Sequence, residues 1–144
     1  MTLTTGTPAP DFPLSDETGT QRRLSDYSGQ HVVLYFYPKD DTPGCTTEAC
    51  GFRDHMPAFT DVDAIVLGLS PDDVASHKRF TEKYGLNFPL LADANHAVAE
   101  RYGVWVEKQR DGKTYMGIAR TTFIIDADGR VAHVFRNVNP AGHE

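Results

Sequence analysis

Residues 31–37, with the sequence His-Val-Val-Leu-Tyr-Phe-Tyr, limit the possible folds of this chain more than any other segment. A continuous run of β-branched, leucine and aromatic residues favours a β-strand, and the lack of polar alternation is typical of a strand covered on both faces. The run is far shorter than the ~20 apolar residues that a membrane-spanning helix needs. Pro38 ends it, and the turn-rich segment Lys-Asp-Asp-Thr-Pro-Gly follows. We therefore expect a buried central strand that leads directly into a loop.

Strand-like and helix-like segments alternate along the rest of the chain. Ahead of the central strand we expect a short strand at 12–14 and a loop at 24–29. The segments that follow it predict helices at 43–59, 71–84 and 95–102, and strands at 64–69, 88–91, 113–118, 121–126 and 131–135. This order predicts an α/β fold with a central mixed sheet flanked by helices. It is the thioredoxin-like order with an insertion, although the spacing also fits other α/β sheets.

Capping signals mark the ends of the predicted helices. Thr42 is expected to cap the first helix, with Pro43 at its first position and Pro57 disturbing its last turn. Ser70 is expected to cap the second helix. Asp93 is expected to cap the third.

Length and charge narrow the class of protein. The 144 residues fit one domain, which we expect to span 1–144. The formal net charge of −6 argues against a nucleic-acid partner, which would require a basic face. The first residues lack the basic and apolar regions of a secretory signal. The six histidines show no metal-ligand spacing, so we expect neither a metal nor a cofactor.

The two cysteines, Cys45 and Cys50, are the candidate reactive groups. Two thiols so close together, in a chain without an export signal, fit redox or catalytic thiols of a reducing, cytoplasmic compartment better than a secreted disulfide scaffold. Cys45 falls in the first turn of the helix predicted at 43–59. Free backbone N–H groups and the helix dipole at that end favour the nucleophilic thiolate. The alternative is that Cys45 is a buried, inert core residue.

The spacing of the cysteines restricts how they could pair. Five residues along an α-helix advance about 7.5 Å and rotate about 140°. That separation exceeds the ~7 Å between Cα atoms that a disulfide allows. The pair therefore predicts either no disulfide or a conformational switch in which part of the helix unwinds. Cys50 could also simply lie on the core face of the helix.

The segment from Tyr35 to Cys50, YFYPKDDTPGCTTEAC, closely resembles the active-site segment of the peroxiredoxin Q family, also called bacterioferritin comigratory protein. Further similar segments are Phe-Arg-Asp at 52–54, Tyr-Gly-Val-Trp at 102–105 and Gly-Ile-Ala-Arg-Thr-Thr-Phe at 117–123. The resemblance covers nearly the whole chain. It implies a thioredoxin-like fold and the reduction of hydrogen peroxide and organic hydroperoxides.

The resemblance also implies a role for each matching residue. Cys45 is similar to the peroxidatic cysteine and Cys50 to the resolving cysteine of two-cysteine members. Thr42 would offer a hydroxyl to the thiolate and the peroxide, and Pro38 would shield the pocket. Arg120 matches the active-site arginine, whose permanent charge and forked donors can stabilise a thiolate and orient two oxygens at once.

The implied cycle runs through a sulfenic acid on Cys45 and an intramolecular disulfide with Cys50, and thioredoxin or a similar dithiol then reduces that disulfide. We expect a monomer without a membrane partner. Two alternatives stay open: a thioredoxin-like thiol-disulfide exchange protein, and a non-catalytic chaperone or binding module. Simple exchange needs neither Thr42 nor Arg120.

Two further charged residues, Glu48 and Arg53, lie near the cysteines on the same predicted helix. Surface ion pairing is the expected role of both, and the alternative is that either one tunes the pocket. The resemblance implies a C-terminal helix, whereas this chain ends at Gly142, His143 and Glu144. We therefore expect one face of the sheet to be less covered there.

Overall fold

A computed structural model describes residues 4–136 of the chain. Its elements, in chain order, are β1 (Pro13–Ser15), β2 (Gln21–Arg23), the 3₁₀ helix η1 (Leu24–Tyr27), β3 (His31–Phe36), α1 (Pro43–Asp54), α2 (Met56–Asp61), β4 (Ala64–Ser70), α3 (Val74–Tyr84), β5 (Leu90–Ala92), α4 (Ala97–Arg101), β6 (Trp105–Arg110), β7 (Lys113–Ile118), β8 (Thr121–Ile125) and β9 (Val131–Arg136).

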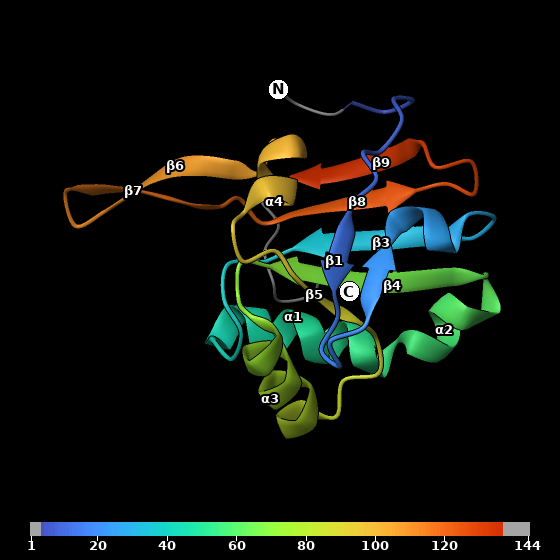
Figure 1. The fold of residues 1–144 in the computed structure, drawn as a ribbon, viewed down its shortest axis with the longest axis horizontal. Helices are drawn as coiled ribbons and strands as arrows, with labels where there is room; N and C mark the ends of the chain where they lie inside the picture. The colour runs from blue at the N-terminus through green and yellow to red at the C-terminus, as the bar shows by residue number, and fades with distance from the viewer. Residues whose placement is uncertain (1–3, 137–144) are drawn as a thin grey trace.

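Within these residues, seven strands form a mixed sheet in the order β2-β1-β5-β4-β3-β8-β9 (Figure 1). Strand β3 pairs in parallel with β4 and antiparallel with β8, so it lies inside the sheet. The predicted central strand and the mixed sheet are both confirmed.

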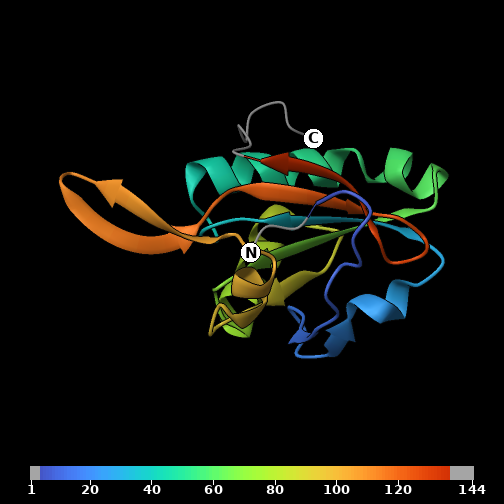
Figure 2. The ribbon, with the colours of Figure 1, turned by 90° about the horizontal axis from the view of Figure 1, so that it is seen from above.

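The two faces of the sheet carry separate apolar clusters, which explains the unbroken apolar run of β3. Val33, Tyr35 and Tyr37 pack on one side with residues of α1 and α3. Leu34 and Phe36 pack on the other side with α4 and the N-terminal segment. Successive strand residues point to opposite faces, so both sets must be apolar when both faces are covered. Figure 2 shows α1 and α2 above the sheet and α4 below it.

Strands β6 and β7 form a separate antiparallel hairpin that projects from the sheet (Figures 1 and 2). The strand at 113–118 was expected, but its partner β6 was not. The polar run Glu-Lys-Gln-Arg of β6 lacks the apolar alternation that reveals a strand. The same reason applies to the polar strand β2. The hairpin returns the chain to the sheet through Ala119 and Arg120, directly before β8.

Two predicted helix boundaries are wrong. The single helix expected at 43–59 divides into α1 and α2, with His55 between them. Pro57 lacks a backbone N–H and cannot continue the first helix, but it is tolerated in the first turn of the second. Helix α3 is capped by Asp73, whose side chain accepts from the Ser76 amide at 2.8 Å. Ser70 instead ends β4.

Asp93 does serve the start of α4, because its carboxylate accepts from the amides of Val98 at 3.2 Å and Ala99 at 2.9 Å.

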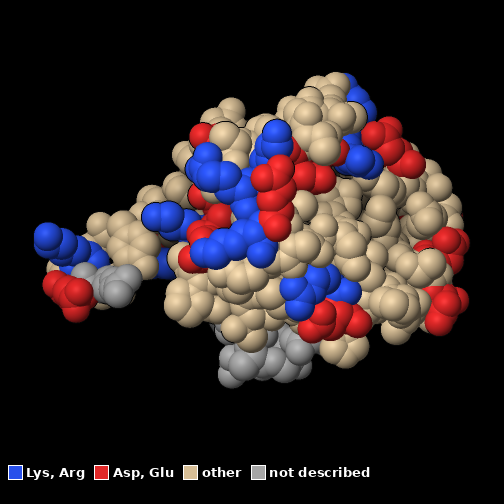
Figure 3. All heavy atoms as spheres, turned by 90° about the horizontal axis from the view of Figure 1, so that it is seen from below, with Lys and Arg blue, Asp and Glu red and all other residues tan. Residues whose placement is uncertain are grey.

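No helix within residues 4–136 has the length and apolar character to cross a membrane. Figure 3 views the α3 side, where basic and acidic side chains are interspersed. The expectation about the C-terminal end at 142–144 lies outside the described residues.

Candidate active site

Cys45 lies in the first turn of α1, immediately after the loop that leaves the carboxyl end of β3. Pro43 begins the helix, as predicted, and the first turn exposes amides that have no acceptor inside the helix. The side chain of Cys45 is free and only 1% exposed. The sequence therefore places a thiol where a negative sulfur would be stabilised, inside the protein and away from bulk water.

Arg120 contacts this sulfur directly. Its Nη2 donates to Cys45 Sγ at 2.9 Å, and its Nη1 donates to Glu48 Oε1 at 2.9 Å. The connection from β7 to β8 delivers Arg120 across 75 residues of sequence to the start of α1. The planar guanidinium can thus hold two neighbouring acceptors in fixed directions at the same time.

Glu48 lies inside the cysteine site rather than at the surface. It is only 1% exposed and pairs with Arg120, so the surface setting expected for its ion pair is wrong, and the alternative that Glu48 tunes the pocket stays a prediction. Its position three residues after Cys45 was the available signal, because residues i and i+3 share one face of a helix. Arg53 does form the expected ion pair, with Asp54 at 2.9 Å.

Thr42 and Pro38 lie in the loop that joins β3 to α1. Thr42 occupies the N-cap position, as predicted, but its side chain makes no capping hydrogen bond. Its hydroxyl donates instead to the carbonyl oxygen of Lys39 at 3.0 Å. Pro38 is half-buried directly after the central strand. The structure thus gathers Cys45 and Arg120 in direct contact, with Thr42 just before the thiol in the chain.

Cys50 lies further along the same unbroken helix, half-buried and free. The spacing argument therefore applies in full: a rise of about 7.5 Å and a rotation of about 140° separate it from Cys45. The two thiols cannot bond while α1 keeps this form.

Aromatic rings close the inner side of the site. The ring of Tyr35 stacks on Phe52 of α1 with centroids 4.7 Å apart. Burial raises the pKa of the Tyr35 hydroxyl well above its usual range, and the negative charges of Glu48 and Cys45 raise it further. Tyr35 therefore stays neutral, and it covers the site with packed apolar surface.

Three side chains of metal-ligand type also gather beside the loop: Asp40, Asp72 and His77. Their oxygen and nitrogen atoms lie within 4.8 Å of one another. These atoms are engaged in hydrogen bonds within the protein, including one from Ser70 Oγ to Asp72 Oδ2 at 2.8 Å. A metal ion would have to displace those bonds.

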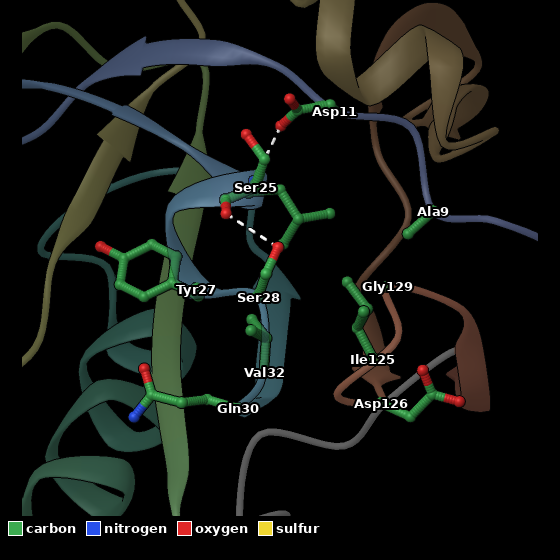
Figure 4. A pocket seen from close by; sticks show the side chains of 11 residues that line it. Ala9, Asp11, Ser25, Tyr27, Ser28, Gln30, Val32, Ile125, Asp126 and Gly129 are labelled. Carbon is green, nitrogen blue, oxygen red and sulfur yellow. Dashed lines mark hydrogen bonds between the residues drawn. The ribbon is translucent and has the colours of Figure 1, made fainter.

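A pocket of about 130 Å³ lies at the amino end of β3, whereas Cys45 follows the carboxyl end of that strand (Figure 4). Its polar groups bond within the chain: Ser28 Oγ donates to the Ser25 carbonyl at 2.9 Å, and Asp11 accepts from the Ser25 amide at 3.0 Å. This pocket is separate from the cysteine site.

Comparison with known proteins gives matches along nearly the whole chain. The model of the AhpC/TSA family matches residues 5–134. Peroxiredoxin Bcp of Bacillus subtilis (strain 168) is 50% identical over 143 residues, which are 99% of this chain and 91% of that protein. Peroxiredoxin Bcp of Escherichia coli (strain K12) is 50% identical over 141 residues, which are 98% of this chain and 90% of that protein.

Solved structures agree with these sequence matches. A mutant of Xanthomonas campestris Peroxiredoxin Q superposes with a TM-score of 0.91 at 42% identity, covering 96% of this chain and 91% of that one. A second structure, of the bacterioferritin comigratory protein of the same organism, has a TM-score of 0.91 at 41% identity and covers 97% and 92% of the two chains. That protein was studied for alkyl peroxide reduction. The thioredoxin-like fold and the resemblance to peroxiredoxin Q are both confirmed.

Proposed function

The chain belongs to the AhpC/TSA family of peroxiredoxins, and we propose that its thiol peroxidase activity runs through Cys45 with Cys50 as the resolving thiol. Its substrates are hydrogen peroxide and organic hydroperoxides. We further propose that residues 1–144 act as a single domain in the cytoplasm. We propose a monomer because both thiols of the cycle belong to one chain.

The contact between Arg120 and the sulfur of Cys45 carries this proposal. A guanidinium donor aimed at a buried sulfur favours the thiolate, which is the nucleophilic form. Plain disulfide exchange does not require a fixed cation at this point. A non-catalytic binding module would need neither the cation nor the thiol.

The first step oxidises Cys45. Its thiolate attacks one oxygen of the peroxide, so a sulfur–oxygen bond forms while the oxygen–oxygen bond breaks. The leaving oxygen takes up a proton and departs as water or an alcohol, and Cys45 becomes a sulfenic acid. Arg120 holds the attacking sulfur and offers donors to the peroxide oxygens. Thr42 can turn its hydroxyl from Lys39 towards the same oxygens, and Pro38 limits the entry of water.

The second step joins the two cysteines. The Cys50 thiolate attacks the sulfur of the Cys45 sulfenic acid, a sulfur–sulfur bond forms, and the hydroxyl leaves as water after protonation. Because α1 holds the thiols apart, the helix must open locally before this step. A thioredoxin-like dithiol then reduces the disulfide by two exchange reactions and is itself oxidised.

The test is peroxide consumption with thioredoxin and thioredoxin reductase, using wild type, Cys45→Ser and Cys50→Ser. We expect Cys45→Ser to be inactive. Cys50→Ser should lose thioredoxin-dependent turnover but still consume one equivalent of peroxide per chain. Continued turnover by Cys45→Ser would overturn the proposal, and full turnover by Cys50→Ser would remove the resolving role.

A further inference from the structure

His77 of α3 is a buried titratable residue that the proposed cycle does not use. Its side chain is fully buried and lies against the loop before Cys45. Its Nδ1 is 2.6 Å from Asp40 Oδ2, and its Nε2 is 2.9 Å from the carbonyl oxygen of Leu91 in β5. Both ring nitrogens therefore face oxygen atoms.

The partners of the ring decide where its protons lie. The carbonyl oxygen of Leu91 can only accept, so His77 Nε2 must carry a hydrogen. In a neutral ring Nδ1 would then be an acceptor, facing a carboxylate oxygen that is also an acceptor. A separation of 2.6 Å requires a proton between Nδ1 and Asp40 Oδ2.

Asp40 accepts two other hydrogen bonds, which favour its ionised form. The Tyr37 hydroxyl donates to Oδ1 at 2.5 Å, and the Ser76 hydroxyl donates to Oδ2 at 2.8 Å. Burial raises the pKa of the Tyr37 hydroxyl well above its usual range, so Tyr37 remains a donor. A carboxylate that accepts from two hydroxyl groups is stabilised as the anion. The shared proton therefore belongs on His77, which makes the ring an imidazolium.

The same carboxylate fixes the course of the loop. The Asp40 amide donates to Asp72 Oδ2 at 2.8 Å, so both its backbone and its side chain are held against the start of α3. Two residues later Thr42 begins α1, and Cys45 follows in the first turn. An outer tether, the exposed ion pair of Lys83 with Asp41 at 2.8 Å, joins the same two elements.

We propose that His77, in its doubly protonated form, is a positioning residue for the peroxidase reaction: it holds Asp40 and thereby fixes the start of the helix that carries Cys45. This inference rests on the proposed function. The titratable groups that face the ring or its carboxylate partner are Tyr37 directly after β3, Asp40 from the loop and Asp72 before α3. A ring without a hydrogen on Nδ1 would set a lone pair against the Asp40 carboxylate and weaken the hold of α3 on the loop.

Two variants of His77 separate its two contacts. The amide nitrogen of glutamine matches the place of Nε2, so His77→Gln keeps the donor to Leu91 and loses the donor to Asp40. The amide nitrogen of asparagine matches Nδ1, so His77→Asn keeps the donor to Asp40 and loses the other. Each variant loses one buried hydrogen bond and the charge of the ring, so we expect both to lower thermal stability, and His77→Gln more because its lost bond joins the Asp40 carboxylate.

The measurement is the second-order rate constant for oxidation of Cys45 by hydrogen peroxide, made in the Cys50→Ser background so that resolution does not limit it. We expect His77→Gln to lower this constant by about tenfold to about a hundredfold, because small misplacements of reacting groups have effects of that size. His77→Asn should lose much less. The matched control Lys83→Met, which removes the exposed ion pair with Asp41 and the contact of Lys83 with the Tyr84 ring, should stay within about twofold.

The outcomes keep the two proposals apart. If the Cys50→Ser parent fails to react with peroxide, the proposed function fails. If the parent reacts and His77→Gln reacts equally fast, or if both His77 variants lose the same factor, the positioning role is overturned and the function stands. Nitrogen-15 NMR of the reduced protein should show a hydrogen on both ring nitrogens of His77; a hydrogen on Nε2 alone would contradict the imidazolium.

Discussion

Replacing Arg120 by methionine is the most informative single change at the cysteine site. Methionine keeps most of the side-chain volume but removes the donor to Cys45 Sγ and the partner of Glu48. The sulfur then stays in the first turn of α1 without its cationic contact. We expect slower oxidation of Cys45 by peroxide, because both the thiolate and the charge that develops on the leaving oxygen lose stabilisation.

The contact distances give the size of the effect. At an effective dielectric constant of about 20, unit charges 2.9 Å apart, as for Arg120 Nη2 and Cys45 Sγ, interact by about 6 kcal/mol. Glu48 contacts the same guanidinium at an equal 2.9 Å and offsets part of that energy. Removal of one preorganised donor in other enzymes costs about 3 to 4 kcal/mol. That range corresponds to a rate constant lower by a factor of about 10² to 10³.

The assay is stopped-flow oxidation of the Cys50→Ser background by hydrogen peroxide at neutral pH. Because Arg120→Met leaves the buried Glu48 carboxylate without this partner, the double variant Arg120→Met with Glu48→Gln is measured beside it. Arg79→Met removes an exposed arginine of α3 and serves as the charge control. A rate constant within threefold of the parent in both site variants, with their helix content retained, would refute the role of Arg120.

Two predictions concern stability. Burial alone would raise the pKa of the Asp16 carboxyl, but its hydrogen bonds, among them one from Arg22 at 2.5 Å, outweigh burial and hold that pKa below its usual range. Its stabilising effect is therefore present at neutral pH and lost as pH falls through the lowered folded pKa. Asp16→Asn should lower the unfolding free energy by about 1–3 kcal/mol at neutral pH and by less in acid; urea unfolding that shows a pH-independent difference would contradict this. In Gly68→Ala, the new Cβ would lie 2.9 Å from both Tyr35 Cζ and Leu90 Cδ2. We therefore expect the free energy of unfolding, measured by thermal unfolding, to fall by about 1–3 kcal/mol. An unchanged midpoint would contradict this, because it would mean that the neighbouring side chains move aside without cost.

The sequence predicts the parts of the fold that depend on neighbouring residues. The apolar run at 31–37 indicates a strand covered on both faces, because successive residues point to opposite faces and all of them are apolar apart from His31. Pro43 marks the start of α1 through its own backbone preference, and it lies where it was expected. Gly85 ends α3 in a left-handed conformation, which glycine adopts readily. Strand β6 was not predicted, because it is defined by its pairing with β7 and its own residues show no strand pattern.

The site depends on contacts between distant segments of the chain, and local sequence patterns predict such contacts less well than they predict helices and strands. Arg120 was identified through the resemblance alone, since nothing near it in sequence points to Cys45. Glu48 was expected at the surface because its partner arrives from 72 residues away. The burial of His77 against Asp40 joins elements 37 residues apart. Such polar groups become interpretable only when the fold shows which charges face each other.

The most direct test of the account is the form of the helix once the two thiols have joined. Wild-type protein is treated with one equivalent of hydrogen peroxide, its disulfide is mapped by peptide mass spectrometry, and amide hydrogen exchange is compared with the reduced protein. We predict a disulfide between Cys45 and Cys50, accompanied by faster exchange within residues 43–54. If the disulfide forms and amide exchange within residues 43–54 stays unchanged, the claim that α1 must unwind is contradicted. If the disulfide does not form, the resolving role of Cys50 is contradicted.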